Sequence, residues 1–299
     1  MSPLRAALGQ FIDYAGLFPP AGLDLDTTVA NYERYACSPE RWMLGRLVLP
    51  LTGLDAVAEA LARSSEPRPH HGIAALATAG DGIDSIADAI DRFHASAGTA
   101  GVTVTAVETA PNGPDAVSAL RGHLVTLDRF VEIPLDATRD TWLDAVAEAG
   151  CGAKIRTGGV TADRFPSPAS LAALLDACAR RRLPLKATAG LHHAVRDAYR
   201  LTYHAGSPSG VMHGFVNLLV AALVVRTRAG TPADAQRALE VRNPREFTLD
   251  EDAIHWDGHA FSADECADTR RHLLRSVGSC SFEEPVADLR ALRWLPLEG

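Results

Sequence analysis

The sequence predicts an α/β fold, a TIM-type (β/α)8 barrel that occupies residues 1–299 as a single domain. Short apolar segments alternate with stretches of three- and four-residue apolar spacing along almost the whole chain. The interval between successive apolar segments is roughly 25–30 residues, the length that a repeated βα unit requires. A chain of 299 residues suits one barrel of this kind, and no linker or low-complexity tract indicates a second domain.

Eight segments are expected to form the strands. Six of them are short and apolar, as the buried strands of a parallel sheet are. One further segment near each end of the chain is needed to close the barrel. The six are 46–50, 72–78, 102–108, 129–135, 153–157 and 183–189, and the two closing segments are 14–18 and 279–282.

Helices are expected between the strands, where apolar residues recur every three or four positions. Ser167 followed by Pro168 offers an N-cap and a first-turn proline, so one helix should begin there. The predicted helices are 54–64, 81–97, 114–124, 138–149 and 168–181.

A small β-hairpin is expected as an insertion near the C-terminus. An Asp-Gly pair at 257–258 separates two short β-like runs within 253–262, as a tight turn would. Ser262 and Glu265 then have the spacing of a capping box, which predicts a helix at 263–276.

Composition and charge exclude several classes of partner. The formal net charge is −8, and an arginine run at 180–182 is the one basic cluster, so neither nucleic acid nor a membrane surface is expected to bind. The N-terminus lacks the features of a secretion signal, and the longest apolar run, 214–225, is too short to span a membrane. Five scattered cysteines without C-x-x-C spacing fit reduced thiols. We expect a cytoplasmic protein whose partner is a small molecule, and the apolar segment at 211–225 is compatible with a homo-oligomer.

Lysine usage is the most unusual feature of the composition. The 29 basic residues comprise 27 arginines and only two lysines, Lys154 and Lys186. Arginine keeps its proton under nearly all conditions, whereas a desolvated lysine can lose its proton and become a nucleophile. The two lysines are therefore candidates for amine chemistry.

The two lysines lie in similar segments, each a short strand that runs into glycine. Ends of parallel barrel strands face the active site, so we expect Lys154 and Lys186 to be neighbours there. Burial and a second cation nearby predict that at least one of them has a pKa well below that of a free lysine. An unprotonated amine attacks a carbonyl and forms a Schiff base, which eases cleavage or formation of the adjacent carbon–carbon bond.

These segments resemble the paired lysine strands of deoxyribose-phosphate aldolase and related class I aldolases. The matching motifs are K-x-x-T-G at 154–158 and K-A-x-x-G at 186–190, about 40 residues of the chain. The resemblance implies that Lys154 is the Schiff-base lysine and that Lys186 lowers its pKa. The family's aspartate on an earlier strand has no clear match, and Glu108 and Glu132 are the available substitutes. Glu132, in an apolar segment, is the predicted proton shuttle.

Several further residues are predicted to bind the substrate at the mouth of the barrel. Arg156 shares the strand face of Lys154 and can grip an anionic group. Glycines at the strand ends allow close approach to the backbone. Histidines and an asparagine follow the second lysine segment and offer hydrogen bonds. The set is Arg156, Gly158, Gly159, Gly190, His192, His193, His213 and Asn217.

The first hypothesis is thus a Schiff-base-forming, aldolase-like lyase that acts on a small carbonyl metabolite without a cofactor. The alternative is a metal-dependent hydrolase or isomerase in which His192, His193 and His213 hold a divalent metal. A third is a barrel that binds a small metabolite without turnover. The lysines can also form structural salt bridges with Glu108 and Glu132.

Overall fold

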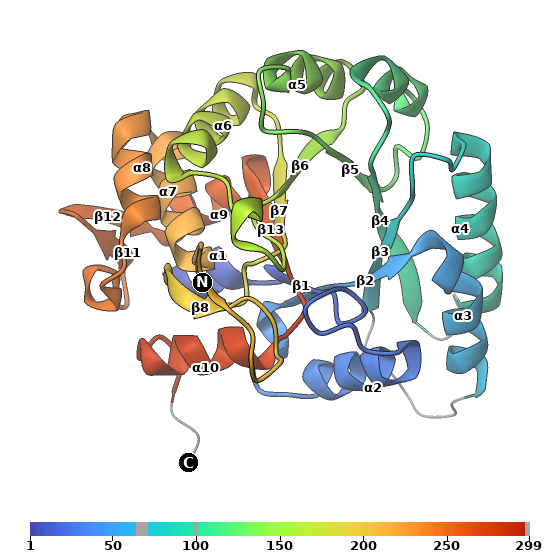
Figure 1. The fold of residues 1–299 in the computed structure, drawn as a ribbon, viewed down its shortest axis with the longest axis horizontal. Helices are drawn as coiled ribbons and strands as arrows, with labels where there is room; N and C mark the ends of the chain where they lie inside the picture. The colour runs from blue at the N-terminus through green and yellow to red at the C-terminus, as the bar shows by residue number, and fades with distance from the viewer. Residues whose placement is uncertain (64–70, 98–100, 297–299) are drawn as a thin grey trace.

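The computed structural model describes residues 1–63, 71–97 and 101–296, and these residues build the predicted barrel (Figure 1). Within the described ranges, eight parallel strands close in the order β1-β13-β7-β6-β5-β4-β3-β2. Figure 1 looks along the barrel, with the strands around the middle and the helices outside them. The strands are β1 (Ile12–Tyr14), β2 (Leu44–Pro50), β3 (His71–Leu76), β4 (Val102–Thr109), β5 (Asp128–Glu132), β6 (Gly152–Arg156), β7 (Leu185–Thr188) and β13 (Leu274–Ser279).

The six central strands were predicted to within a few residues, whereas the last strand was misplaced. The predicted helix at 263–276 ends at His272, and β13 begins two residues later, upstream of the predicted segment 279–282. The side chain of Arg270 donates to the carbonyl oxygens of Leu274 and Arg275 at 3.0 and 2.6 Å, and so holds that chain extended.

Helices cover the outside of the barrel. The apolar run predicted at 214–225 forms a helix that is buried on all sides, because other helices pack around it. The predicted helix at 114–124 is a 3₁₀ helix, Pro114–Leu120. None of the helices in the described ranges is long and apolar enough to cross a membrane. The α-helices are α1 (Pro3–Leu8), α2 (Leu25–Ala36), α3 (Leu54–Arg63), α4 (Ile83–Ala97), α5 (Arg139–Glu148), α6 (Pro168–Arg181), α7 (Phe215–Thr227), α8 (Pro232–Glu240), α9 (Ala263–His272) and α10 (Glu283–Ala291).

Two small antiparallel sheets are added to the barrel. The predicted hairpin is confirmed as β11 (Ala253–Trp256) and β12 (His259–Ser262), and β10 (Thr248–Leu249) extends it to three strands. The predicted capping box of Ser262 and Glu265 opens α9. A second hairpin, β8 (Asp197–Arg200) with β9 (Ser209–Met212), follows β7 and was not predicted.

The interior of the barrel differs from the core that surrounds it. The large apolar core lies between the strands and the helices, and a separate small cluster of Val48, Ala74 and Ala106 lies on β2, β3 and β4. A typical barrel of this type is filled with branched apolar side chains. Small residues on this side leave room for the charged side chains of the strands opposite.

Arg270 ties the two ends of the chain together where the barrel closes. Besides the two carbonyls of β13, its guanidinium donates to the carbonyl oxygens of Ala7 and Gly9 at 2.6 and 3.2 Å. It also lies 4.4 Å from the centre of the Phe11 ring. One rigid fork of N–H groups therefore satisfies four carbonyl groups around the junction of α1, α9 and β13.

We expect Arg270→Lys to lower the free energy of unfolding by roughly 2–4 kcal/mol, because an ammonium cannot reach all four carbonyls and some stay unsatisfied. Urea unfolding of both proteins measures the difference. The neighbouring Arg271→Lys, at an exposed position, serves as the control and should leave the stability unchanged. Equal stability of Arg270→Lys and the parent would show that these carbonyls find other partners.

Candidate active site

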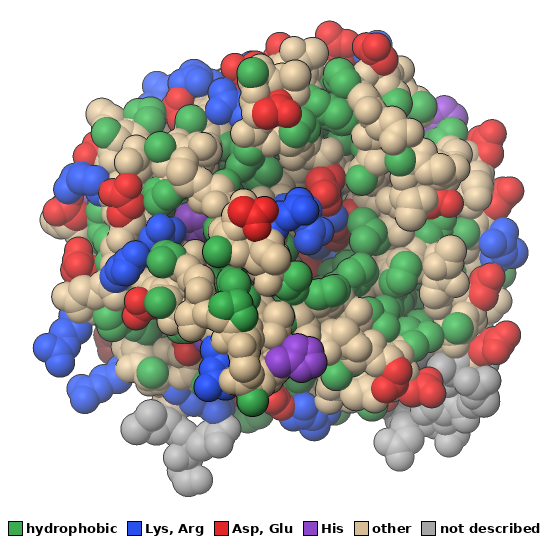
Figure 2. All heavy atoms as spheres, viewed as in Figure 1, with side chains coloured by type: hydrophobic (Ala, Val, Ile, Leu, Met, Phe, Trp, Pro, Cys, Tyr) green, Lys and Arg blue, Asp and Glu red, His purple; other side chains and the backbone are tan. Residues whose placement is uncertain are grey.

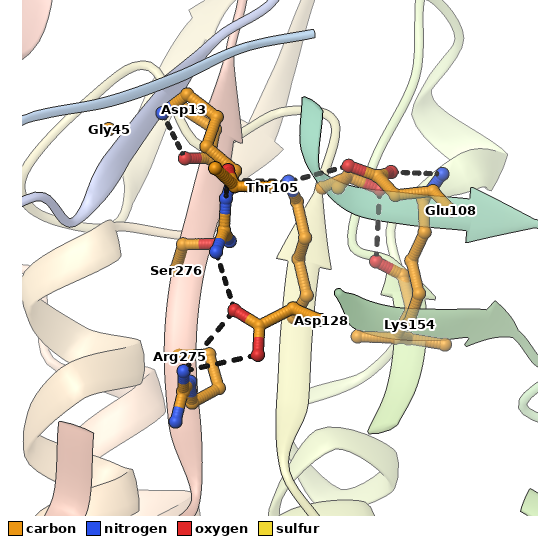
Figure 3. Close-up of polar contacts among 12 residues, drawn as sticks. Asp13, Gly45, Thr105, Glu108, Asp128, Lys154, Arg275 and Ser276 are labelled. Atoms are coloured by element: carbon orange, nitrogen blue, oxygen red, sulfur yellow. Dashed lines mark hydrogen bonds and ion pairs between the residues drawn. The ribbon is translucent and has the colours of Figure 1, made fainter. Parts of the chain in front are cut away.

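A chain of charged side chains runs through the interior of the barrel. Arg46 on β2 binds Asp128 on β5 at 2.5 Å, and Lys186 on β7 binds Glu108 on β4 at 2.6 Å. Neither pair of strands is adjacent in the barrel. Contacts between non-adjacent strands of a closed barrel cross its interior, so these side chains point inward. Figure 3 shows the chain of contacts, from Asp128 and Arg275 to Lys154 and Glu108.

The two lysines are direct neighbours, as predicted. Lys154 on β6 is the register partner of Lys186 on β7, and on its other side Lys154 is the register partner of Glu132 on β5. The Lys154 Nζ lies 3.1 Å from Glu132 Oε2. Glu132 therefore points into the barrel, where the sequence analysis placed the proton shuttle.

Glu108 is the group that both lysines share. Its Oε2 lies 2.8 Å from Lys154 Nζ and its Oε1 lies 2.6 Å from Lys186 Nζ. Its side chain is 1% exposed. Each carboxylate oxygen thus faces one ammonium group, and the two cations are held on either side of one buried anion.

Asp13 on β1 completes the cluster. It is not among the site residues predicted from the sequence. Its Oδ2 forms an ion pair with Lys186 and accepts a hydrogen bond from Ser276 Oγ at 2.8 Å. Its Oδ1 accepts from the backbone N–H of Arg46 at 2.7 Å. With all these partners in place, Asp13 is 1% exposed.

The carboxylates reverse the pKa expected for Lys186. Burial by itself would lower its pKa, but the charges of Asp13 and Glu108 outweigh burial, and the pKa is raised above its usual value. Burial likewise opposes ionisation of Glu108, yet the two lysines lower its pKa to about 2. Of the two lysines, Lys186 is therefore not the one with the lowered pKa that the sequence predicts for at least one of them, because two carboxylates face it. Lys186 is a permanent cation at neutral pH.

Exposure increases along the cluster toward the carboxyl ends of the strands. The exposed fraction of the side chain is 0% for Lys186, 5% for Lys154 and 25% for Glu132. Glu132 and the exposed Arg156 are the last residues of β5 and β6. Acidic and basic side chains lie together near the middle of the face in Figure 2. Lys154 is thus the lysine that a molecule entering from this end meets first.

The glycines predicted to admit the substrate face protein side chains instead. A Cβ at Gly158 or Gly190 would lie 2.5 or 2.7 Å from the Phe165 ring, and one at Gly159 would lie 2.9 Å from Arg164 Cβ. The 3₁₀ turn after β6 therefore fills this space. Gly158 and Gly190 permit Phe165 to pack on the strand ends, and the predicted role of the three glycines in substrate approach stays a prediction.

His192 and His193 diverge from the lysine cluster. His192 Nδ1 lies 3.2 Å from Ser279 Oγ and 3.5 Å from Cys280 Sγ. His193 Nδ1 lies 3.1 Å from Asp288 Oδ2. Burial lowers the pKa of His192 to about 4 and raises that of Cys280 to about 11, so this histidine and thiol face each other as neutral groups.

His213 and Asn217 hold the segment before α7 in place. His213 Nε2 donates to the Pro166 carbonyl at 2.7 Å, and its Nδ1 lies 3.1 Å from Arg196 NH1. The Asn217 side chain accepts from the Arg196 N–H at 2.8 Å. It also donates to two backbone carbonyls beside α8, at 2.8 Å each. Both residues are buried and bonded to protein groups, so the structure gives each of them a structural contact, and their contact with a substrate stays a prediction.

The positions of the three histidines also contradict the alternative hypothesis of a divalent-metal site. His192, His193 and His213 each bind a different protein partner and do not converge. Across residues 1–63, 71–97 and 101–296, no group of three or more His, Cys, Asp or Glu side chains is arranged to hold a metal ion. The three histidines therefore do not form the predicted divalent-metal site.

The sequence offered one signal that would have found Asp13. It is a lone acidic residue inside a buried three-residue strand, as Glu132 is a lone acid within an apolar segment. A charge in such a position needs a partner of opposite sign. Glu108 was predicted only as a substitute for the aspartate of the aldolase family, and it contacts both lysines inside the barrel.

Comparison with known proteins adds little to this site. No family model matches the chain, and no curated protein matches it. Among solved structures, a lysine/ornithine decarboxylase complexed with cadaverine from Vibrio vulnificus is similar at TM-score 0.38 and 12% sequence identity. That match covers 92% of this chain and 58% of the other, so this chain spans less than two thirds of that protein's length.

We expect His213 to make the protein less stable in acid. Burial and Arg196 lower its pKa from 6.5 to about 4, although the Pro166 hydrogen bond opposes this. Between these values the unfolded chain binds more protons than the folded one, so stability falls as the pH falls from about 6.5 to 4. Urea unfolding at several pH values should show a slope smaller by up to about 1.4 kcal/mol per pH unit in His213→Gln. The exposed His204→Gln should keep the parent slope, and an unchanged slope in His213→Gln would contradict the assignment.

Proposed function

We propose that the chain is a Schiff-base-forming lyase that acts on a small carbonyl metabolite, with Lys154 as the nucleophile. One observation carries this proposal: Lys154 Nζ lies between the buried Glu108 and the partly exposed Glu132, at 2.8 and 3.1 Å. A lysine that lies between a fixed anion and an accessible proton acceptor has what imine formation needs. The resemblance to class I aldolases supports the same assignment.

Glu132 is assigned the proton transfers at Lys154. Its carboxylate accepts a proton from the Lys154 ammonium, and the free amine attacks the substrate carbonyl carbon to form a carbinolamine. Glu132 then returns the proton to the carbinolamine hydroxyl, and water leaves as the iminium forms. The ammonium and carbonyl are thus converted to an iminium and one water, with Glu132 unchanged at the end.

Lys186 is assigned an electrostatic role. It is fully buried and remains charged between Asp13 and Glu108. Its fixed positive charge lies next to Lys154, and Glu108 stands between the two ammonium groups. Once the iminium has formed, it withdraws electrons from the adjacent carbon–carbon bond, whose cleavage or formation is the proposed reaction.

The charged residues at the mouth of the barrel favour some substrate charges over others. Arg156 is exposed at the end of β6 and is available to an anionic group of the substrate. Glu283 and Glu284, next to each other after the last strand, disfavour a phosphate on that side, which fits an unphosphorylated or partly cationic metabolite. A cytoplasmic location and a homo-oligomeric state remain part of this proposal.

A second candidate function is a barrel that binds a small metabolite without turnover. The observation in its favour is that both lysines are ion-paired, with Asp13, Glu108 and Glu132 as the partners. In such a pocket, a polar ligand binds when the charged side chains give up ion pairs with one another and form contacts with the ligand. This candidate predicts ligand binding without any covalent adduct.

Borohydride reduction in the presence of small aldehydes, ketones and keto acids tests the nucleophile. We expect intact-mass spectrometry to show one adduct, which peptide mapping places on Lys154 and which Lys154→Arg abolishes. Two lysines in the chain make the assignment direct. An adduct on Lys186 would reverse the two roles. A folded protein that binds a carbonyl compound but gives no adduct would favour the binding barrel.

We expect Glu132→Gln to slow adduct formation by at least about tenfold at pH 7, because general acid–base groups contribute roughly 10²–10⁴-fold. The rate should partly recover as the pH rises and solvent base takes over the deprotonation of Lys154. The time course of reductive trapping measures both effects. Glu148→Gln, which removes a surface acid that pairs with Arg121, is the matched control. A parent-like rate and pH profile in Glu132→Gln would exclude it as the proton shuttle.

A further inference from the structure

A cavity of about 830 Å³ opens at the amino-terminal end of the barrel, opposite to Glu132 and Arg156. Its wall includes residues at the beginnings of strands, such as Leu44 of β2, Gly72 of β3 and Asp128 of β5. The volume is within the roughly 300–1,000 Å³ of small-molecule sites. The proposed lyase reaction makes no use of this cavity.

Arginine dominates the charge of the cavity wall. Six arginines line it, against two carboxylates. Both carboxylates are already paired: Asp128 with Arg46 and Arg275, and Asp13 with Lys186. The six are Arg5, Arg41, Arg46, Arg270, Arg271 and Arg275.

Four of these arginines have no carboxylate partner among the described residues. Arg270 donates to backbone carbonyls, and Arg5 lies over the Trp42 ring at 4.7 Å. Arg41 and Arg271 are exposed at the rim. Burial lowers the pKa of Arg270 to about 9, as expected for a cation without a counter-charge, and it remains protonated at neutral pH. The wall of this open cavity therefore carries positive charge that no carboxylate of the wall offsets.

We propose that this cavity binds a small multivalent anion, a metabolite that carries phosphate or several carboxylates, at a site separate from the lysine cluster. Guanidinium groups form paired hydrogen bonds with both kinds of oxyanion. The concave wall excludes an extended macromolecule and suits a compact ligand. The four guanidinium groups without a carboxylate partner supply positive charge for a ligand with at least two negative groups, and the exposed Arg41 and Arg271 are the ones placed to bind it directly.

The cavity also adjoins the charged chain inside the barrel. Asp13 and Ser276 belong to its wall, and the same Asp13 carboxylate binds Lys186 (Figure 3). An anion in the cavity is therefore separated from the lysine cluster by the carboxylate of Asp13. This contact gives the site a physical connection to the centre of the barrel, whichever reaction occurs there.

Titration calorimetry on the full chain, with inorganic pyrophosphate and with citrate at constant ionic strength, tests the proposal. We expect saturable binding of at least one of them with one site per chain, and the tighter of the two identifies phosphate or carboxylate chemistry. Arg41→Gln and Arg271→Gln should each weaken binding at least fivefold, because each removes an unpaired charge from the rim. Arg200→Gln, an exposed arginine on β8, should leave binding unchanged.

Two further variants separate this site from the lysine cluster. Lys154→Arg and Arg156→Gln should bind the anion as the parent does, whatever they do to carbonyl trapping. Loss of binding in Arg156→Gln would place the anion at the carboxyl-terminal mouth and overturn the proposal. The proposal also fails if neither probe binds at millimolar concentration, or if the two rim variants bind like the parent in protein shown to be folded.

Discussion

The shared contact of Glu108 with both lysines is the interaction on which the rest of the site depends. Two ammonium groups on adjacent strands repel each other in an environment that hydrates neither. One carboxylate with an oxygen toward each of them, at 2.8 and 2.6 Å, offsets that repulsion. Removing one partner of a buried ion pair leaves an uncompensated charge and costs about 3–5 kcal/mol. Glu108 therefore holds both lysines inside the barrel.

The same logic extends along the whole interior. Asp128 pairs with Arg46 and Arg275, while Asp13, Glu108 and Glu132 pair with the two lysines. The backbone N–H of Arg46, which donates to Asp13, connects the two groups. Small residues such as Ala74 and Ala106 on the facing strands give these long side chains room. Such an interior is costly to desolvate, and an apolar core would give the fold at least equal stability. Its presence is therefore better explained by function than by stability.

The sequence predicted the barrel well and the site in part. The βα period and the capping signals located the central strands, and the rarity of lysine identified Lys154 and Lys186. Asp13 was not predicted as a site residue because it lies 173 positions from Lys186 in the sequence, and its strand has only three residues. The structural contacts of His213 and Asn217 were not predicted, because sequence does not reveal which buried backbone groups need a side-chain partner. Their bonds to Pro166 and to the chain beside α8 come from tertiary structure alone.

The burial gradient is the basis of the different roles proposed for the two lysines. Lys186 is 0% exposed and lies between two carboxylates that are each 1% exposed, so no solvent-accessible base can take its proton. Lys154 has the same buried anion on one side but a partly exposed carboxylate, Glu132, on the other. A proton that leaves Lys154 has an acceptor that can exchange with solvent. The proposal thus assigns different reactivity to identical side chains in register on adjacent strands, because their carboxylate neighbours differ in exposure.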